Sequence, residues 1–152
     1  NIAFLNKGVG GMGAFYRSQH EMVPIFKNGK AKHQNHIQLG KNGRYRTNVW
    51  DYSGIRVTNP GSLDLLRLHP TVKPVAMLHD ILLDASSKND VVLDCFGGSG
   101  STLIAAERCK RRARLIEISP RYCDVIIYRW RQETGKTAKL VKNYKELEND
   151  VR

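Results

Sequence analysis

The sequence contains no apolar stretch close to the roughly 18 residues that a helix needs to cross a bilayer, and no signal-peptide pattern opens it. Cysteine is scarce, and the spacing of Cys95, Cys109 and Cys123 does not match a metal site. Because three thiols cannot all pair with one another, we expect buried free thiols in a reducing cytosol. These absences favour a cytoplasmic protein that has no membrane partner and no metal.

Acidic residues are also few, since 14 Asp and Glu stand against 25 Lys and Arg, for a formal net charge of +11. The excess is uneven, because residues 1–68 carry ten basic and three acidic side chains. Positive charge of this size favours a polyanion such as nucleic acid as the partner. A basic surface that only keeps the protein in solution is the alternative. The concentration of charge in a loop-like half puts nucleic acid ahead.

The 152 residues are enough for one domain with a hydrophobic core. The first residue is Asn1 and not Met, so we expect the chain to be part of a longer polypeptide. Residues 1–5 and 20–26 read as strands on either side of a glycine-rich loop, and Pro24 favours an edge position for the second strand. Residues 27–68 are polar and basic, contain Tyr45, Trp50 and Tyr52, and have no clean period.

Residues 74–141 alternate between helical and strand-like patterns. Val75, Leu78, Leu82 and Ala85 follow helical spacing, with Pro74 in the first turn. The further expected elements are a buried strand at 90–95, a helix at 103–109 capped by Ser99 or Ser101, a strand at 113–119, a helix from Ser119 and Pro120 onward, and a last strand at 137–141. Such alternation predicts a parallel sheet covered by helices, with ligands bound beyond the carboxyl ends of its strands.

Two glycine-rich segments compete as ligand-binding loops. The segment GVGGMG matches a dinucleotide fingerprint through Gly8, Gly10 and Gly13, but loop and then strand follow it where the mechanism requires a helix. No acidic residue stands about 20 positions later to hold a ribose. We therefore interpret this match as a loop that links two adjacent strands.

The segment DCFGGSGST lies instead between a predicted strand and a predicted helix. Glycines there let the backbone approach a ligand closely, and free N–H groups at the helix start can bind a carboxylate or phosphate. Glu117 follows Asp94 at the end of the next strand, where a carboxylate can accept hydrogen bonds from both ribose hydroxyls. This pattern predicts a nucleoside-binding site. A tight turn without a ligand is the alternative, and Glu117 counts against it.

At this point the chain resembles the DNA amino-methyltransferases, which use S-adenosylmethionine to methylate adenine N6 or cytosine N4. The resemblance runs from residue 4 to residue 141, although Cys95 stands where the family motif has a proline. The matching segments, in chain order, are NKGVGGMGAFYRSQHEMVPIF (6–26), RTNVWDYSG (46–54), HPTVKP (69–74), VVLDCFGGSGSTLIAAE (91–107) and LIEISPRYCD (115–124).

The resemblance implies an α/β chain with part of the Rossmann-like class I methyltransferase fold. Its parts would be a strand–loop–strand unit (1–26), an irregular basic insertion that recognises the target (27–68), an S-adenosylmethionine-binding half (69–141) and a charged tail (142–152).

The same resemblance implies two sets of contact residues. Those expected at S-adenosylmethionine are Thr71, Lys73, Pro74, Asp94, Phe96, Gly97, Gly98, Ser99, Gly100, Ser101, Thr102 and Glu117. Among them, Thr71 and Lys73 would hold the carboxylate, the amides of residues 96–100 would face the methionine portion, and Glu117 would take the ribose. Asp94 would anchor the loop or reach the amino group. Those expected at DNA phosphates are Arg17, Lys27, Lys30, Lys32, Lys41, Arg44 and Arg46.

The catalytic motif of the family, Asp/Ser/Asn-Pro-Pro-Tyr/Phe/Trp, is absent, and no Pro-Pro occurs. In the family its polar side chain and a backbone carbonyl accept the hydrogens of the target amine, and its aromatic ring stacks on the flipped base. The catalytic residues of this chain are therefore unknown. We expect the C-terminal portion of a methyltransferase, with a gap in its sheet where two central strands belong, inactive by itself.

The expected partners are double-stranded DNA, the N-terminal portion of the same enzyme and, as an option, a second copy of the chain. Adenine is favoured as the target on family frequency. Two alternatives remain: a nucleic-acid-binding relic of the fold without catalysis, and a nicotinamide-dependent oxidoreductase. The glycine spacing at 97–100 and the segment HPTVKP argue against the oxidoreductase.

Overall fold

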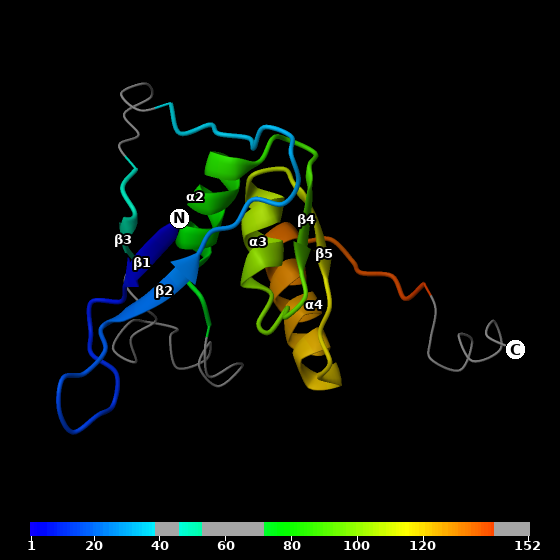
Figure 1. Ribbon diagram of the computed structural model, residues 1–152. Helices are drawn as coiled ribbons and strands as arrows, with labels where there is room; N and C mark the ends of the chain where they lie inside the picture. The colour runs from blue at the N-terminus through cyan, green and yellow to red at the C-terminus, as the bar shows by residue number, and fades with distance from the viewer. Residues whose placement is uncertain (39–45, 53–71, 142–152) are drawn as a thin grey trace, which may run out of the picture.

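The computed structural model describes residues 1–38, 46–52 and 72–141, and within them it has two small sheets and three helices (Figure 1). None of these helices is both long and apolar enough to cross a membrane. The elements in chain order are β1 (Ile2–Asn6), β2 (His20–Pro24), β3 (Val49–Asp51), α2 (Val75–Ala85), β4 (Val91–Asp94), α3 (Ser101–Arg108), β5 (Arg112–Leu115) and α4 (Pro120–Thr134).

The first sheet has the strand order β2-β1-β3. β1 pairs antiparallel with β2 and parallel with β3. The glycine-rich loop connects β1 to β2, which confirms that the GVGGMG match is a link between adjacent strands. Pro24 ends β2 at the sheet edge, as predicted. β3 was not predicted, because three residues inside a basic stretch are too few to produce a recognisable period.

The second sheet consists of β4 and β5, which run parallel and are joined by α3. The two small sheets are separate, as expected for a sheet with a gap. Along β4 the side chains alternate, with Val91 and Leu93 56% and 64% exposed and Val92 half-buried. α3 packs on β5 and on α4. One face of this sheet is therefore covered by helices, and the face that carries Val91 and Leu93 is bare.

α2 joins the two halves of the structure. It packs against α3, and two of its carboxylates hold the segment before and after β3. Arg46 Nε donates to Asp84 at 2.9 Å, Arg46 Nη1 donates to the Tyr52 hydroxyl at 2.8 Å, and that hydroxyl donates to Asp80. Beyond the end of α2, Arg111 donates to Ser86 and thereby ties α2 to the end of α3.

The start of α3 differs from the prediction. Neither Ser99 nor Ser101 caps the helix through its side chain; Gly100 is the N-cap, with φ 79° in the left-handed region, and Ser101 is the first helical residue. A Cβ at Gly100 would lie 3.1 Å from the Ile126 side chain of α4. Glycine is therefore required here both by the backbone conformation and by the closeness of α4.

Other expectations need correction at their boundaries. The strand predicted at 113–119 ends at Leu115, and the residues predicted as a last strand, 137–141, are irregular. Leu140 and Val141 are 82% and 89% exposed, and no described strand pairs with this segment. Of the thiols expected to be buried, Cys109 is buried and Cys123 half-buried, whereas Cys95 is exposed.

Replacement of Gly100 provides a test of how closely α4 packs on this loop. Gly135 serves as the matched control, because it also has a left-handed φ but open space around its Cα. We expect Gly135→Ala to lower the free energy of unfolding by about 1 kcal/mol. Gly100→Ala should lower it by about 2–4 kcal/mol, since crowding against Ile126 adds to the strain. Chemical denaturation measures both, and equal losses would contradict the packing.

Candidate functional site

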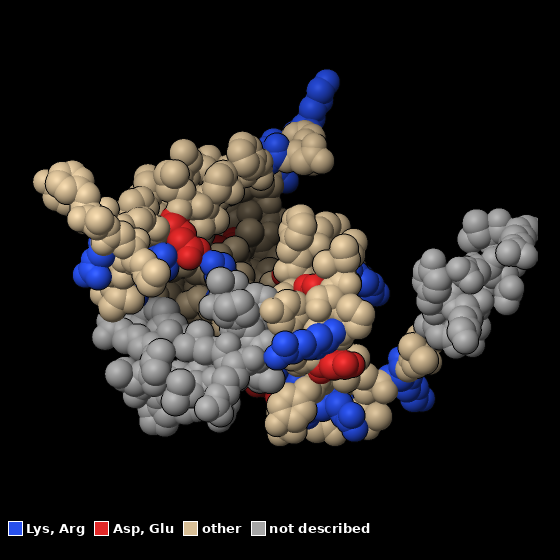
Figure 2. Space-filling view, turned by 90° about the horizontal axis from the view of Figure 1, so that it is seen from below, with Lys and Arg blue, Asp and Glu red and all other residues tan. Residues whose placement is uncertain are grey.

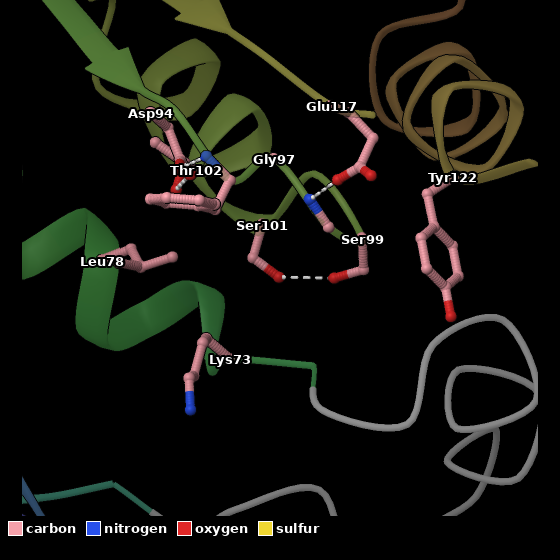
Figure 3. Close-up of a pocket in the computed structure, with 11 residues that line it drawn as sticks. Lys73, Leu78, Asp94, Gly97, Ser99, Ser101, Thr102, Glu117 and Tyr122 are labelled. Carbon is pink, nitrogen blue, oxygen red and sulfur yellow. Dashed lines mark hydrogen bonds between the residues drawn. The ribbon is translucent and has the colours of Figure 1, made fainter. Parts of the chain in front are cut away.

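A cavity of about 470 Å³ opens where β4 ends and α3 begins, at the carboxyl end of the β4–β5 sheet (Figure 3). Its walls come from four parts of the chain: the segment before α2 and α2 itself, the glycine-rich turn after β4, the residues after β5, and the first turn of α4. The lining residues are Lys73, Leu78, Asp94, Phe96, Gly97, Gly98, Ser99, Ser101, Thr102, Glu117 and Tyr122.

Asp94, the last residue of β4, anchors the turn. Its carboxylate accepts the backbone N–H of Phe96 at 3.0 Å and the hydroxyl of Thr102 at 2.6 Å. These two bonds connect the end of the strand to the first turn of α3. These bonds are the ones that the anchoring role considered for Asp94 requires.

Glu117 holds the turn from the other side. Gly98 N–H donates to its Oε2 at 2.7 Å, and Ser119 N–H donates to its Oε1 at 2.9 Å. Figure 3 shows the carboxylate of Glu117 directed toward the glycine-rich turn that carries Gly97 and Ser99. Beside it, Gly97 N–H donates to the carbonyl of Ile116 at 2.9 Å. The carboxylate thus fixes both the glycine turn and the start of α4.

Hydrogen-bond donors collect on the floor of the cavity. Ser99 and Ser101 are only 6% and 5% exposed, and their hydroxyls lie 3.3 Å apart. Within the described residues, the backbone amides of Ser99, Ser101 and Thr102 donate to no carbonyl and no side chain. Buried amides at a helix start need an acceptor, and an anionic group would satisfy them.

Lys73 stands at the rim of the cavity, opposite Glu117 (Figure 3). Its Nζ lies 2.7 Å from Glu21 Oε2 on β2, and Lys7 Nζ lies 3.5 Å from the other oxygen of Glu21. The hydrogen bond from Lys73, with the charges of both lysines, lowers the pKa of Glu21 although partial burial opposes it. Since the Lys73 side chain is 46% exposed, this pair adds little to stability but orients the lysine.

Most of the residues predicted at the cofactor line this cavity. Pro74, the N-cap of α2, and Gly100, the N-cap of α3, are not among the lining residues. Thr71 lies outside the described residues. The prediction missed Leu78 and Tyr122 as lining residues. Leu78 was already expected on the apolar face of a helix. Tyr122 stands in the first turn of the helix that follows Glu117, and this position was the signal that could have identified it as a lining residue.

The residues predicted at DNA have different surroundings. The side chains of Arg17, Lys27, Lys30 and Lys32 are exposed, whereas Lys41 and Arg44 lie outside the described part. Arg46 is instead turned toward α2, with its side chain only 18% exposed. Burial would lower the pKa of Arg46, but its bonds to Tyr52 and Asp84 outweigh that effect and raise it. On the face seen in Figure 2, lysines and arginines lie at several separate places.

The aromatic side chains of the first sheet and its loop also divide into packed and exposed ones. Trp50 donates its indole N–H to the carbonyl of Thr47, and Tyr52 is held between Arg46 and Asp80. Both therefore pack within the structure. In the loop between β1 and β2, by contrast, Phe15 and Tyr16 are 84% and 91% exposed, with ring centroids 4.3 Å apart.

No group of three or more His, Cys, Asp or Glu in the described ranges is arranged to hold a metal ion.

Known proteins resemble the chain in both sequence and structure. It is 39% identical over 88 residues to the type II methyltransferase M1.MboII of Moraxella bovis. This alignment covers 57% of this chain and 32% of that protein. It is 40% identical over 75 residues to the DNA adenine methyltransferase YhdJ of Escherichia coli K12. This alignment covers 49% of this chain and 24% of that protein. The chain thus spans a third or less of the length of these relatives.

TTHA0409 of Thermus thermophilus, solved in complex with S-adenosyl-L-methionine, matches the structure with a TM-score of 0.61 and 25% identity. The match covers 93% of this chain and 57% of TTHA0409. The fold is therefore a Rossmann-like methyltransferase fold, present in part. A family model described as DNA methylase, for N6 and N4 methyltransferases, matches residues 5–128, which is most of the chain. This protein belongs to that DNA methylase family.

Proposed function

We propose that the chain is the cofactor-binding and DNA-contacting portion of a DNA methyltransferase. The complete enzyme would transfer a methyl group from S-adenosylmethionine to an exocyclic amine of a DNA base, with adenine N6 favoured over cytosine N4. The observation that carries this proposal is the cavity between Lys73 and Glu117, whose floor is formed by a glycine turn in which the amides of Ser99 and Ser101 have no acceptor among the described residues. Such a cavity at the carboxyl ends of parallel strands is where α/β proteins bind nucleotide-like ligands.

The donors and acceptors of the cavity suit the two ends of this cofactor. The amides of Ser99 and Ser101, together with Lys73, would bind the carboxylate of the methionine portion. Glu117 would accept the ribose hydroxyls, because each carboxylate oxygen can accept more than one hydrogen bond. Leu78 and Tyr122 add apolar surface, and the volume is within the usual range of small-molecule sites. The cofactor supplies an activated methyl group, and these residues bind and orient it.

The residues that act on the target amine would come from the N-terminal portion of the same enzyme. Two features support this proposal. The sequence has no Pro-Pro with which to hold the amine. The bare face of β4–β5 exposes Val91 and Leu93, and two small sheets stand where the family fold has one. Strands placed between these sheets, with helices on the bare face, would bury this apolar surface and complete the sheet.

For DNA we propose contacts from the first sheet and from the residues that follow it. Arg17 stands in the exposed loop that also carries Phe15 and Tyr16, and Lys27, Lys30 and Lys32 follow β2. Cations would meet phosphates, while exposed aromatic rings can stack on bases. The stretch 27–68 would recognise the target sequence, with Lys41 and Arg44 as further phosphate contacts. Arg46 is not included, because it pairs with Asp84.

Replacement of Glu117 tests the cofactor site. Glu117→Ala should weaken S-adenosylmethionine binding by about 1–3 kcal/mol, because charge-assisted hydrogen bonds are lost. Glu133→Ala is the control, since it removes a carboxylate that pairs with Arg108 away from the cavity. Tryptophan fluorescence titrations measure both variants. Unchanged affinity for Glu117→Ala would remove this residue from the site, and wild-type binding of NAD without S-adenosylmethionine would favour the oxidoreductase.

Joining the chain to an N-terminal segment that carries the catalytic tetrapeptide tests the division of labour. We expect methyl transfer to DNA from the joined protein and none from the chain alone. Leu93→Lys should abolish this complementation without affecting cofactor binding, because a charge would then stand on the face to be covered. Leu140→Lys, at a residue 82% exposed outside the sheets, is the control. An inactive joined protein that still binds DNA would favour the relic.

The salt dependence of DNA binding tests the phosphate contacts. Arg17→Ala and Lys30→Ala should each reduce the slope of log K against log salt by about one. Arg131→Ala removes an equal charge from an exposed position on α4 and should leave the slope unchanged. Filter binding at several salt concentrations measures the slopes, and a flat response in the unmodified chain would contradict the proposed interface.

A further inference from the structure

One face of α4 packs directly behind the glycine turn. Tyr122, Ile126 and Arg129 are spaced by four and three residues, so they lie on the same side of the helix. Tyr122 lines the cavity. The Ile126 side chain is so close that a Cβ at Gly97 or Gly100 would lie 3.1 Å from it. α4 therefore determines where the backbone of the turn can run.

Arg129 makes the polar contact in this packing. Its Nη1 donates to the carbonyl oxygen of Ser99 at 2.5 Å and reaches the hydroxyl of Ser101 at 3.4 Å. Arg129 does not line the cavity, so it contacts the turn from the side of α4. These two serines are among the residues whose amides have no acceptor in the described part of the chain. The guanidinium thus holds the backbone of the same residues that would bind an anion.

The charge of Arg129 is not neutralised where it lies. Within the described residues no carboxylate stands within 4 Å of the guanidinium, since Glu133 pairs with Arg108 instead. Burial lowers the pKa of Arg129, and the neighbouring Arg108 lowers it further, although Glu133 opposes this shift. The N-terminus of α3 adds its own partial positive charge at the same place. Arg129 and the start of α3 therefore both place positive charge behind the turn that carries Ser99 and Ser101.

We propose that Arg129 is a positioning residue of the cofactor site, which holds the Ser99 carbonyl on the α4 side of the turn and makes the floor selective for a carboxylate. This inference rests on the proposed function, because it assigns the methionine end of S-adenosylmethionine to the amides of Ser99 and Ser101. Glu117, which holds the turn through Gly98, would then serve the nucleoside end. The two ends of the ligand would depend on different residues.

The test compares two ligands that share the adenosine group. S-adenosylmethionine carries the amino-acid carboxylate, and 5′-methylthioadenosine lacks it. Arg129→Met should weaken binding of S-adenosylmethionine at least about tenfold and binding of 5′-methylthioadenosine less than about threefold. Arg129→Lys keeps the charge and should recover part of the loss. Arg131→Met, at an exposed position on the same helix, should change neither affinity. Isothermal titration gives the affinities, and thermal melts show whether each variant is folded.

Each possible result bears on the proposal. Equal losses for both ligands in Arg129→Met, or a loss that Arg129→Lys shares in full, would mean that Arg129 only maintains the fold, and the proposal would be overturned. Unchanged affinity for S-adenosylmethionine would overturn it as well. If Arg129→Met does not fold, the ratio of the two ligand affinities in Arg129→Lys decides whether the proposal stands. An unmodified chain that binds neither ligand would refute the proposed function, a different failure that is recognised before any variant is made.

Discussion

The hydrogen bond from Gly98 N–H to Glu117 is the contact on which the site depends. It joins the turn after β4 to the segment after β5, which are the two ligand-facing ends of the small parallel sheet. Asp94 makes the corresponding bonds to Phe96 and Thr102 within the first of these segments. Two carboxylates, each at the end of a parallel strand, thus convert a flexible glycine sequence into a fixed turn. Without them the backbone entropy of the glycines would oppose any single arrangement.

The glycines of this turn leave room for the packing of α4 as well as for a ligand. A side chain at Gly97 or Gly100 would meet Ile126 of α4 before it met anything bound in the cavity. The close approach of α4 also brings Arg129 to the Ser99 carbonyl. The helix that follows Glu117 therefore supports the turn from behind, while the cavity opens on the other side. Because residues of the turn both pack against α4 and line the cavity, substitutions have to be judged by their effect on stability as well as on the proposed binding.

The separate sheets bear on the proposed function of the chain. β4 and β5 are covered by helices on one face only, and Val91 and Leu93 stay exposed on the other. Exposed apolar residues on a sheet face and open strand edges favour association with further polypeptide. Because the catalytic Pro-Pro is also absent, the proposed function places cofactor binding and catalysis in different stretches of polypeptide. The match to only 57% of TTHA0409 agrees with this division.

Local patterns in the sequence were enough to predict β4, α3, β5 and α4 in order, the link between β1 and β2, and the position of Asp94 at the end of β4, whereas β5 ends before Glu117. They worked because apolar spacing and glycine placement are properties of neighbouring residues. Tertiary contacts decided the rest. The N-cap of α3 is Gly100, against which Ile126 lies, and not a serine. Arg46, which the sequence suggested as a DNA contact, pairs with Asp84. The segment 137–141 pairs with no strand among the described residues, and the packing of α4 behind the turn brings Tyr122 to the cavity and Arg129 to the Ser99 carbonyl. A contact between residues far apart in the chain leaves no periodic signal in the sequence, so only the folded structure could assign these residues.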